Sequence, residues 1–88
     1  MISISEKEEI LASAVAGIPR IAELLASFPA EDRTRALDAA KRSYLKTVHD
    51  LGYGEAAAQK WVFAVMRCLR TEVGEMIVNE AIENIAQR

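Results

Sequence analysis

The chain contains a single histidine, His49, whose imidazole is the first group to consider for catalysis or metal binding. Either role needs partners close in space: a nucleophile, an orienting carboxylate or further ligands. The residue three positions earlier is Lys46, so the Glu-x-x-His pairing of carboxylate-bridged di-iron bundles is absent. We interpret His49 as a structural residue near the end of a helix, where the helix dipole favours an imidazolium.

The only cysteine, Cys68, lies between Arg67 and Leu69 in a strongly apolar stretch. Neighbouring arginines can lower the pKa of a thiol, but a nucleophilic role also needs exposure and a base. The sequence has no second cysteine to form a Cys-x-x-Cys pair or a disulfide within the chain. We therefore expect Cys68 to act as a small buried apolar residue, and a lone cysteine suits a reducing cytoplasm.

Two carboxylate pairs, Glu72/Glu75 and Glu80/Glu83, are each spaced three residues apart, so each pair shares a helix face. Paired carboxylates can act as acid and base or bind a divalent ion. Without histidine partners or a glycine-rich loop, we interpret these pairs as a solvated helix surface. The sequence thus predicts a protein that is not an enzyme, with no metal site and no cofactor.

Charge is unevenly distributed, although the net charge is only −2. Residues 33–70 contain eight basic and three acidic side chains, whereas the flanking segments contain three basic and ten acidic ones. This segregation indicates either an anionic partner or acidic helices beside basic ones within or between chains. We favour the second interpretation because nucleic-acid-binding domains are usually basic overall. The candidate residues for binding a partner or an anion are Arg35, Arg42, Lys46 and Trp61.

Trp61 has two open interpretations, since it can anchor a protein partner or cover the junction between two helices. The glycine turn at 52–54 separates two helical stretches in a pattern that also allows a helix-turn-helix. The second stretch begins Glu55 and three alanines, which are poor readers of base edges. Nucleic-acid binding by the basic face of residues 33–70, through phosphates, remains the alternative function.

The segment Leu51-Gly52-Tyr53 followed by Glu55-Ala56 resembles the Leu-Gly-Tyr turn of ubiquitin-associated-like three-helix domains. The resemblance covers only this short stretch and implies a shared way of ending a helix. It implies no function.

Apolar residues recur at intervals of three and four along the chain, which predicts helices throughout and no strands. Ser5 and Glu8 have the spacing of a capping box, Gly17 and Pro19 mark a break, and Pro29 begins a further helix. We expect four helices, over residues 5–16, 19–27, 30–51 and 55–88.

The last of these segments organises the rest, because an uninterrupted helix of about 33 residues would be about 50 Å long. A compact monomer of this size has a radius of gyration of about 12 Å. The helix must therefore fold back near Gly74 or extend beyond its own domain, and we favour extension with pairing to a second chain. The predicted dimer-interface stripe is Val62, Met66, Leu69, Val73, Met76 and Ile77.

The sequence as a whole predicts one all-α domain over residues 1–88, a small bundle of four helices whose last helix is long or kinked at Gly74. We expect dimerisation to complete this bundle, because a thin, alanine-rich core buries little surface. The predicted function is a non-catalytic protein–protein interaction or regulatory module, pairing with itself or with another protein. The sequence shows neither a secretory pattern nor a membrane-spanning run, so we expect a cytoplasmic protein without membrane partners.

Overall fold

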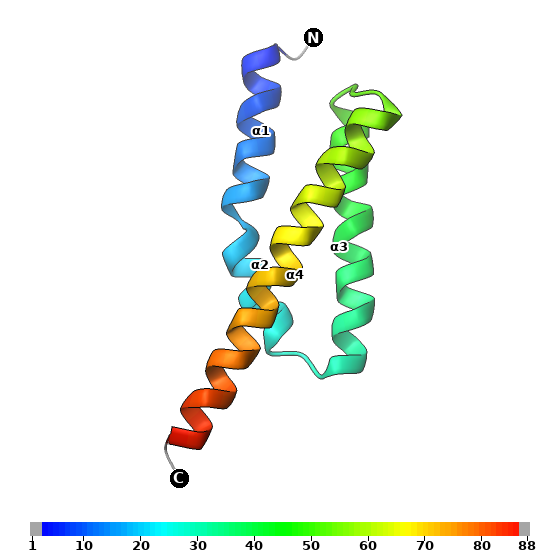
Figure 1. Ribbon diagram of the computed structural model, residues 1–88. Coiled ribbons are helices and arrows are strands. Elements are labelled where there is room, and N and C mark those ends of the chain that lie inside the picture. The colour runs from blue at the N-terminus through cyan, green and yellow to red at the C-terminus, as the bar shows by residue number, and fades with distance from the viewer. Residues whose placement is uncertain (1–2, 87–88) are drawn as a thin grey trace.

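The computed structural model describes residues 3–86, and these residues are all-α, as predicted (Figure 1). The helices are α1 (Ile4–Ala16), α2 (Ile18–Ala26), α3 (Ala30–Asp50) and α4 (Glu55–Ala86). Each lies within two residues of the corresponding predicted segment. None of the helices in residues 3–86 combines the length and apolar character that crossing a bilayer requires.

The first two helices form one bent rod, which corrects the expectation of four separate helices. Gly17 has right-handed helical backbone angles (φ −81°, ψ −9°), and its carbonyl accepts a hydrogen bond from the Ile21 amide at 3.2 Å. Pro19 causes the bend, because its ring lacks an amide donor and clashes with the carbonyl four residues earlier. The described chain therefore contains three helical rods (Figure 1).

The first helix begins two residues earlier than the predicted capping box implies. Ser3 is the N-cap, and its side chain accepts a hydrogen bond from the Glu6 amide at 3.1 Å. This bond satisfies one of the amides that the first turn of a helix leaves without an intrahelical partner. The predicted cap, Ser5, lies inside the helix.

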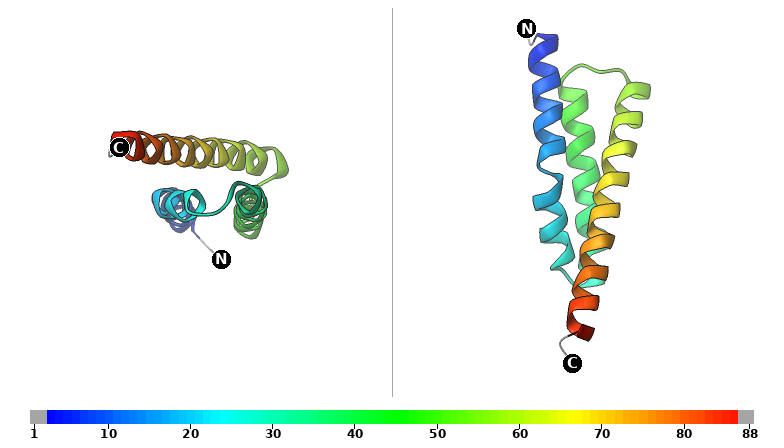
Figure 2. Two further views of the ribbon diagram at one scale, coloured as in Figure 1. Left: turned by 90° about the horizontal axis from the view of Figure 1, so that it is seen from below. Right: turned by 60° about the vertical axis from the view of Figure 1, so that its left-hand side comes forward.

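The rods are arranged in two layers, with α1/α2 beside α3 and α4 lying across both (Figure 2). The packing is closest where α2 and α3 meet α4. The core consists of buried apolar side chains from these three helices: Ile18, Ala22 and Leu25 of α2; Tyr44 and Val48 of α3; and Ala58, Val62, Val65, Met66, Leu69 and Val73 of α4. No residue of α1 is buried.

Arg33 closes the C-terminal end of α2 from the first turn of α3. Its guanidinium donates hydrogen bonds to the carbonyl oxygens of Leu25 (3.0 Å), Ala26 (3.3 Å) and Phe28 (2.7 Å). The last carbonyls of a helix lack intrahelical donors and carry the negative end of the helix dipole, so a cation stabilises them. Arg33 thus belongs to the architecture rather than to a free basic surface.

The turn between α3 and α4 depends on Gly52, as predicted. Gly52 has φ +88°, a backbone conformation that glycine adopts without a steric penalty. The amides of Gly52 and Tyr53 donate to the carbonyls of His49 (2.9 Å) and Val48 (3.4 Å), which is the Schellman arrangement at the end of a helix. This turn reverses the chain so that α4 can pack against α3.

The last helix continues through Gly74 for 32 residues, which resolves the alternative of a kink at this position. The molecule is elongated, with extents of 57 × 24 × 16 Å and a radius of gyration of 15.4 Å. The radius exceeds the value of about 12 Å for a compact domain because the end of α4 projects beyond the other helices (Figure 1). The final two residues of the predicted helix, 87–88, lie outside the described range.

Candidate interaction surfaces

Most of the predicted dimer stripe faces the interior of the protomer. Val62, Met66, Leu69 and Val73 are at most 4% exposed, because α2 and α3 cover them. Met76 and Ile77 are half-buried at the end of this core. The prediction that Val62, Met66, Leu69 and Val73 face a second chain is therefore corrected, because helices of the same chain already cover that face of α4.

The apolar stripe of α4 changes sides after Ile77. The core residues recur at steps of three and four, but Ile82 comes five residues after Ile77, which is a rotation of about 140° around the helix. The side chains of Val78, Ile82 and Ile85 are 56%, 58% and 71% exposed. Every residue from Val78 to Ala86 is exposed, so an apolar edge lies on the projecting end of α4 with no covering element among residues 3–86.

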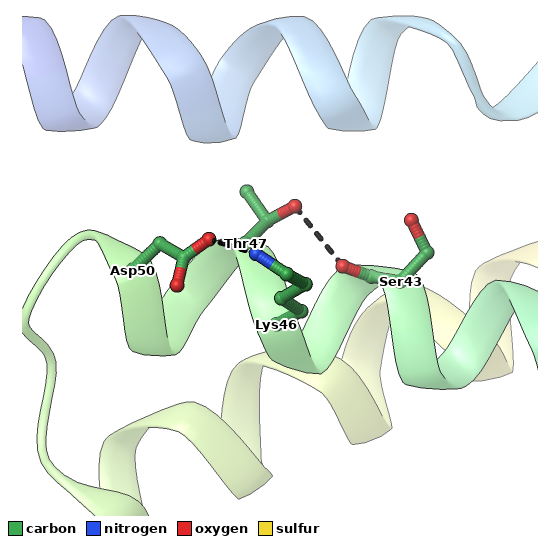
Figure 3. Close-up of polar contacts among 4 residues, drawn as sticks. All are labelled: Ser43, Lys46, Thr47 and Asp50. Carbon is green, nitrogen blue, oxygen red and sulfur yellow. Dashed lines mark hydrogen bonds and ion pairs between the residues drawn. The ribbon is translucent and has the colours of Figure 1, made fainter.

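The candidate basic residues of α3 share its outward side. Arg35, Arg42 and Lys46 are all exposed, and intervals of seven and four residues place them along one helix face. Lys46 forms an ion pair with Asp50 at 2.6 Å, between two highly exposed side chains (Figure 3). Such exposed pairs contribute little stability, and this one neutralises part of the basic face.

Trp61 is separated from those three residues and covers the junction between α3 and α4. Its half-buried indole meets the buried ring of Tyr44 edge-on, with ring centroids 5.9 Å apart and an interplanar angle of 76°. Edge-to-face aromatic pairs stabilise a fold beyond the area that they bury. Burial also raises the pKa of the Tyr44 hydroxyl. Trp61 is therefore better explained by packing than as an anchor for a partner.

His49 links the two ends of the α3–α4 turn. Its Nε2 lies 2.9 Å from a carboxylate oxygen of Glu55, and the other carboxylate oxygen accepts a hydrogen bond from Gln59 at 2.9 Å. The bond from Gln59 and the nearby His49 lower the pKa of Glu55. All three side chains are exposed, and this polar link across a turn agrees with the structural role predicted for His49.

Cys68 is exposed, which corrects the expectation of a buried thiol. It lies one residue before Leu69, so it is rotated by about 100° from the buried face of α4.

The paired carboxylates Glu72/Glu75 and Glu80/Glu83 do not belong to a cluster of possible metal ligands. Within residues 3–86, no three His, Cys, Asp or Glu side chains are placed to hold a metal ion.

A groove between α3 and α4 was not identified from the sequence. One part is lined by Lys41, Gln59, Val62, Phe63, Met66 and Arg70, and the adjoining part by Thr34, Arg35, Leu37, Asp38 and Arg70. Phe63 is 71% exposed, and Lys41 and Arg70 form no ion pair with any described residue. The groove thus combines the exposed ring of Phe63 with the unpaired cations of Lys41 and Arg70, and we call these three the groove residues. In the sequence, only Phe63 indicates such a surface, because this aromatic residue lies outside the spacing of the core residues.

Among residues 3–86, the apolar edge of α4 and the groove between α3 and α4 are therefore exposed surfaces in addition to the outward side of α3. Comparisons of the chain with protein-family models, with curated proteins and with solved structures found no match.

Proposed function

We propose that this protein is a non-catalytic interaction module that works as a homodimer in the cytoplasm. The observation that carries the proposal is the exposed apolar edge of Val78, Ile82 and Ile85 on the projecting end of α4. Single exposed apolar residues are common on protein surfaces, but a contiguous edge on a projecting helix is typical of an interaction site. A second chain would bury this edge, with a gain of roughly 25 cal/mol for each Å² of apolar surface.

The shape of α4 supports a role in assembly rather than in catalysis. About 14 Å of helix, from Val78 to Ala86, extends without neighbours from residues 3–86. A helix end of this length has little intrinsic stability, and most helical stability in proteins comes from packing of an apolar face. A partner for this edge would therefore stabilise the helix and the assembly together.

The test is the solution mass by light scattering after size exclusion, for wild type, Ile82→Glu and Leu24→Glu. Ile82 and Leu24 have the same exposed fraction, 58%, so the two variants add a charge at equally accessible positions. We expect a wild-type dimer, a monomeric Ile82→Glu variant and an unchanged Leu24→Glu variant. A monomeric wild type, or equal behaviour of the two variants, would contradict the proposal.

The second candidate is binding of nucleic acid through phosphate contacts on the outward side of α3. Arg35 and Arg42 are exposed and form no ion pair with any described residue, and this observation favours the candidate. Such binding would weaken steeply with salt as counterions are released. A gel-shift series at low salt tests it, with Arg35→Glu/Arg42→Glu as the comparison. Absence of retardation of the wild type would remove this candidate.

A further inference from the structure

We propose that the groove between α3 and α4 binds an amphipathic helix of another protein, one whose apolar face is flanked by carboxylates. The two rims of the groove come from antiparallel helices that lie side by side (Figure 1). The groove uses residues 59–70 of α4, whereas the apolar edge lies at residues 78–85. This inference therefore goes beyond the proposed homodimer and does not depend on it.

The floor of the groove is apolar. It is formed by Val62 and Met66, which are at most 3% exposed, and by the half-buried Leu37. The ring of Phe63 borders this floor from the α4 rim and is itself largely exposed. A ligand with apolar side chains would cover the ring and the floor together, and the burial of both would stabilise the complex.

The charge of the groove is positive. Lys41 and Arg70 lie on opposite rims, and neither forms an ion pair with any described residue. Arg35 and Asp38 line the adjoining part, so three cations and one carboxylate give a net charge of +2. The whole chain carries −2, so this positive charge is a local property of the groove. Electrostatic complementarity therefore favours an occupant with carboxylates on both sides of its apolar face.

The spacing along the groove matches the repeat of an α-helix. Phe63 and Arg70 are seven residues apart on one helix, about 10 Å along its axis. Lys41 lines the same part of the groove from the opposite rim. An amphipathic helix that docks in a groove repeats its apolar anchors at i, i+4 and i+7. Its apolar stripe can thus follow Phe63 and the floor, while carboxylates on its two flanks reach Lys41 and Arg70.

A nucleic acid fits this groove less well than such a helix. Single strands stack successive bases on aromatic rings, whereas the described residues that line the groove include one ring, that of Phe63. Asp38 on the α3 rim would repel a continuous phosphate backbone. A helix carries carboxylates at separate positions, so it can place them beside Lys41 and Arg70 and away from Asp38.

The probe is a synthetic helical peptide of about 18 residues, a length at which an alanine-rich helix forms in water. It has leucines at i, i+4 and i+7 and glutamates on both flanks (the acidic peptide), and a matched peptide has lysine in place of each glutamate (the basic peptide). Isothermal titration calorimetry at low salt gives both dissociation constants. We expect the wild-type protein to bind the acidic peptide at least about tenfold more tightly than the basic one.

The decisive variant reverses one cation on each rim, Lys41→Glu/Arg70→Glu. We expect it to bind the acidic peptide about tenfold or more weakly than the wild type and to prefer the basic peptide, because the charges that face the ligand change sign. The matched control, Arg42→Glu/Lys60→Glu, reverses one arginine and one lysine on the same two helices. Both control residues are exposed and neither lines the groove, so we expect the control to keep the preference for the acidic peptide.

Phe63→Ser tests the apolar contact without a change in charge, and we expect it to weaken both peptides about tenfold. Circular dichroism verifies that each variant is helical. Absence of binding of the acidic peptide to the wild type at about 1 mM, or equal losses in the decisive variant and its control, would overturn the proposal.

Two further outcomes would assign the groove to a different occupant and would also overturn the proposal. An acidic peptide that converts wild-type dimers into monomers in sedimentation equilibrium would assign the groove to a second copy. A thymidine oligonucleotide that binds the groove more tightly than the acidic peptide would assign it to nucleic acid. Ile82→Glu should bind the acidic peptide as the wild type does, so failure of the homodimer and failure of this inference are distinguishable.

Discussion

Replacement of Arg33 by methionine should lower the stability of the fold by about 2 kcal/mol. The guanidinium donates hydrogen bonds to two carbonyls in the last turn of α2, those of Leu25 and Ala26, and to the Phe28 carbonyl in the turn that follows. Hydrogen bonds from charged groups contribute about 1.5–3 kcal/mol each when buried. Arg33 is half-buried, so water replaces part of what is lost, and we reduce the total to about 2 kcal/mol. Methionine retains a long apolar side chain, which limits the effect of lost packing.

Urea denaturation monitored by circular dichroism gives the change in unfolding free energy, and thermal denaturation should show a decrease of about 10 °C in the melting temperature. The matched control is Arg35→Met, two residues along the same helix, because Arg35 is exposed and donates no hydrogen bond to a described residue. We expect this control to change stability by less than about 0.5 kcal/mol. Equal stability of the two variants, at the same protein concentration, would refute the capping role of Arg33.

Three further predictions follow from single side chains or backbone positions. Gly74→Ala should stabilise the protein by about 1 kcal/mol, because Gly74 lies inside a helix with open space at its Cβ position. Gly52→Ala should destabilise the protein by a similar amount, because Gly52 has positive φ. Thermal denaturation compares the two variants. The Cys68 thiol should react with Ellman's reagent in the native protein at nearly the rate of a free thiol, and a slow reaction would indicate burial. The hydrogen bond from Gln59 lowers the pKa of Glu55 in the folded state. Its stabilising contribution is therefore present above the unfolded pKa of about 4.3 and lost as pH falls through the folded value. The stability difference between wild type and Glu55→Gln should disappear in acid, and a difference that persists at pH 3 would contradict this.

The helices could be located from the sequence because their ends depend on local chemistry. Pro29 restricts the backbone before α3, and Gly52 supplies the left-handed turn after it, so both boundaries are visible in single residues. The predicted N-cap, Ser5, differs from the observed one, Ser3, because Ser3 with Glu6 and Ser5 with Glu8 have the same capping-box spacing. Gly17 has the residue type that favours a helix end, yet its backbone stays right-handed, and the local sequence does not distinguish these two states.

The surfaces were harder to predict because they depend on which face of α4 the other helices cover. Steps of three and four correctly identified Val62, Met66 and Leu69 as one stripe, but periodicity alone does not tell whether the covering helix belongs to the same chain. The rotation of the apolar stripe follows from the five-residue interval between Ile77 and Ile82, which steps of three and four do not describe. The capping role of Arg33 could not be predicted from the sequence either, because its carbonyl partners lie across a turn and the contact exists only once the chain has folded.

The bent rod formed by α1 and α2 has a consequence for hydrogen exchange. Helix α1 has no buried residue, and its anchors are the half-buried Leu11 and Ala14 and the Lys7 ammonium, 5.6 Å from the ring centre of Tyr53. A helix of 13 residues with so little packing is marginally stable in water. We expect α1 to open in sub-global fluctuations while α2, α3 and α4 stay folded. Amides of α1 should then exchange with solvent deuterium well before those around Leu69, so the bend at Pro19 separates two units that unfold at different free energies.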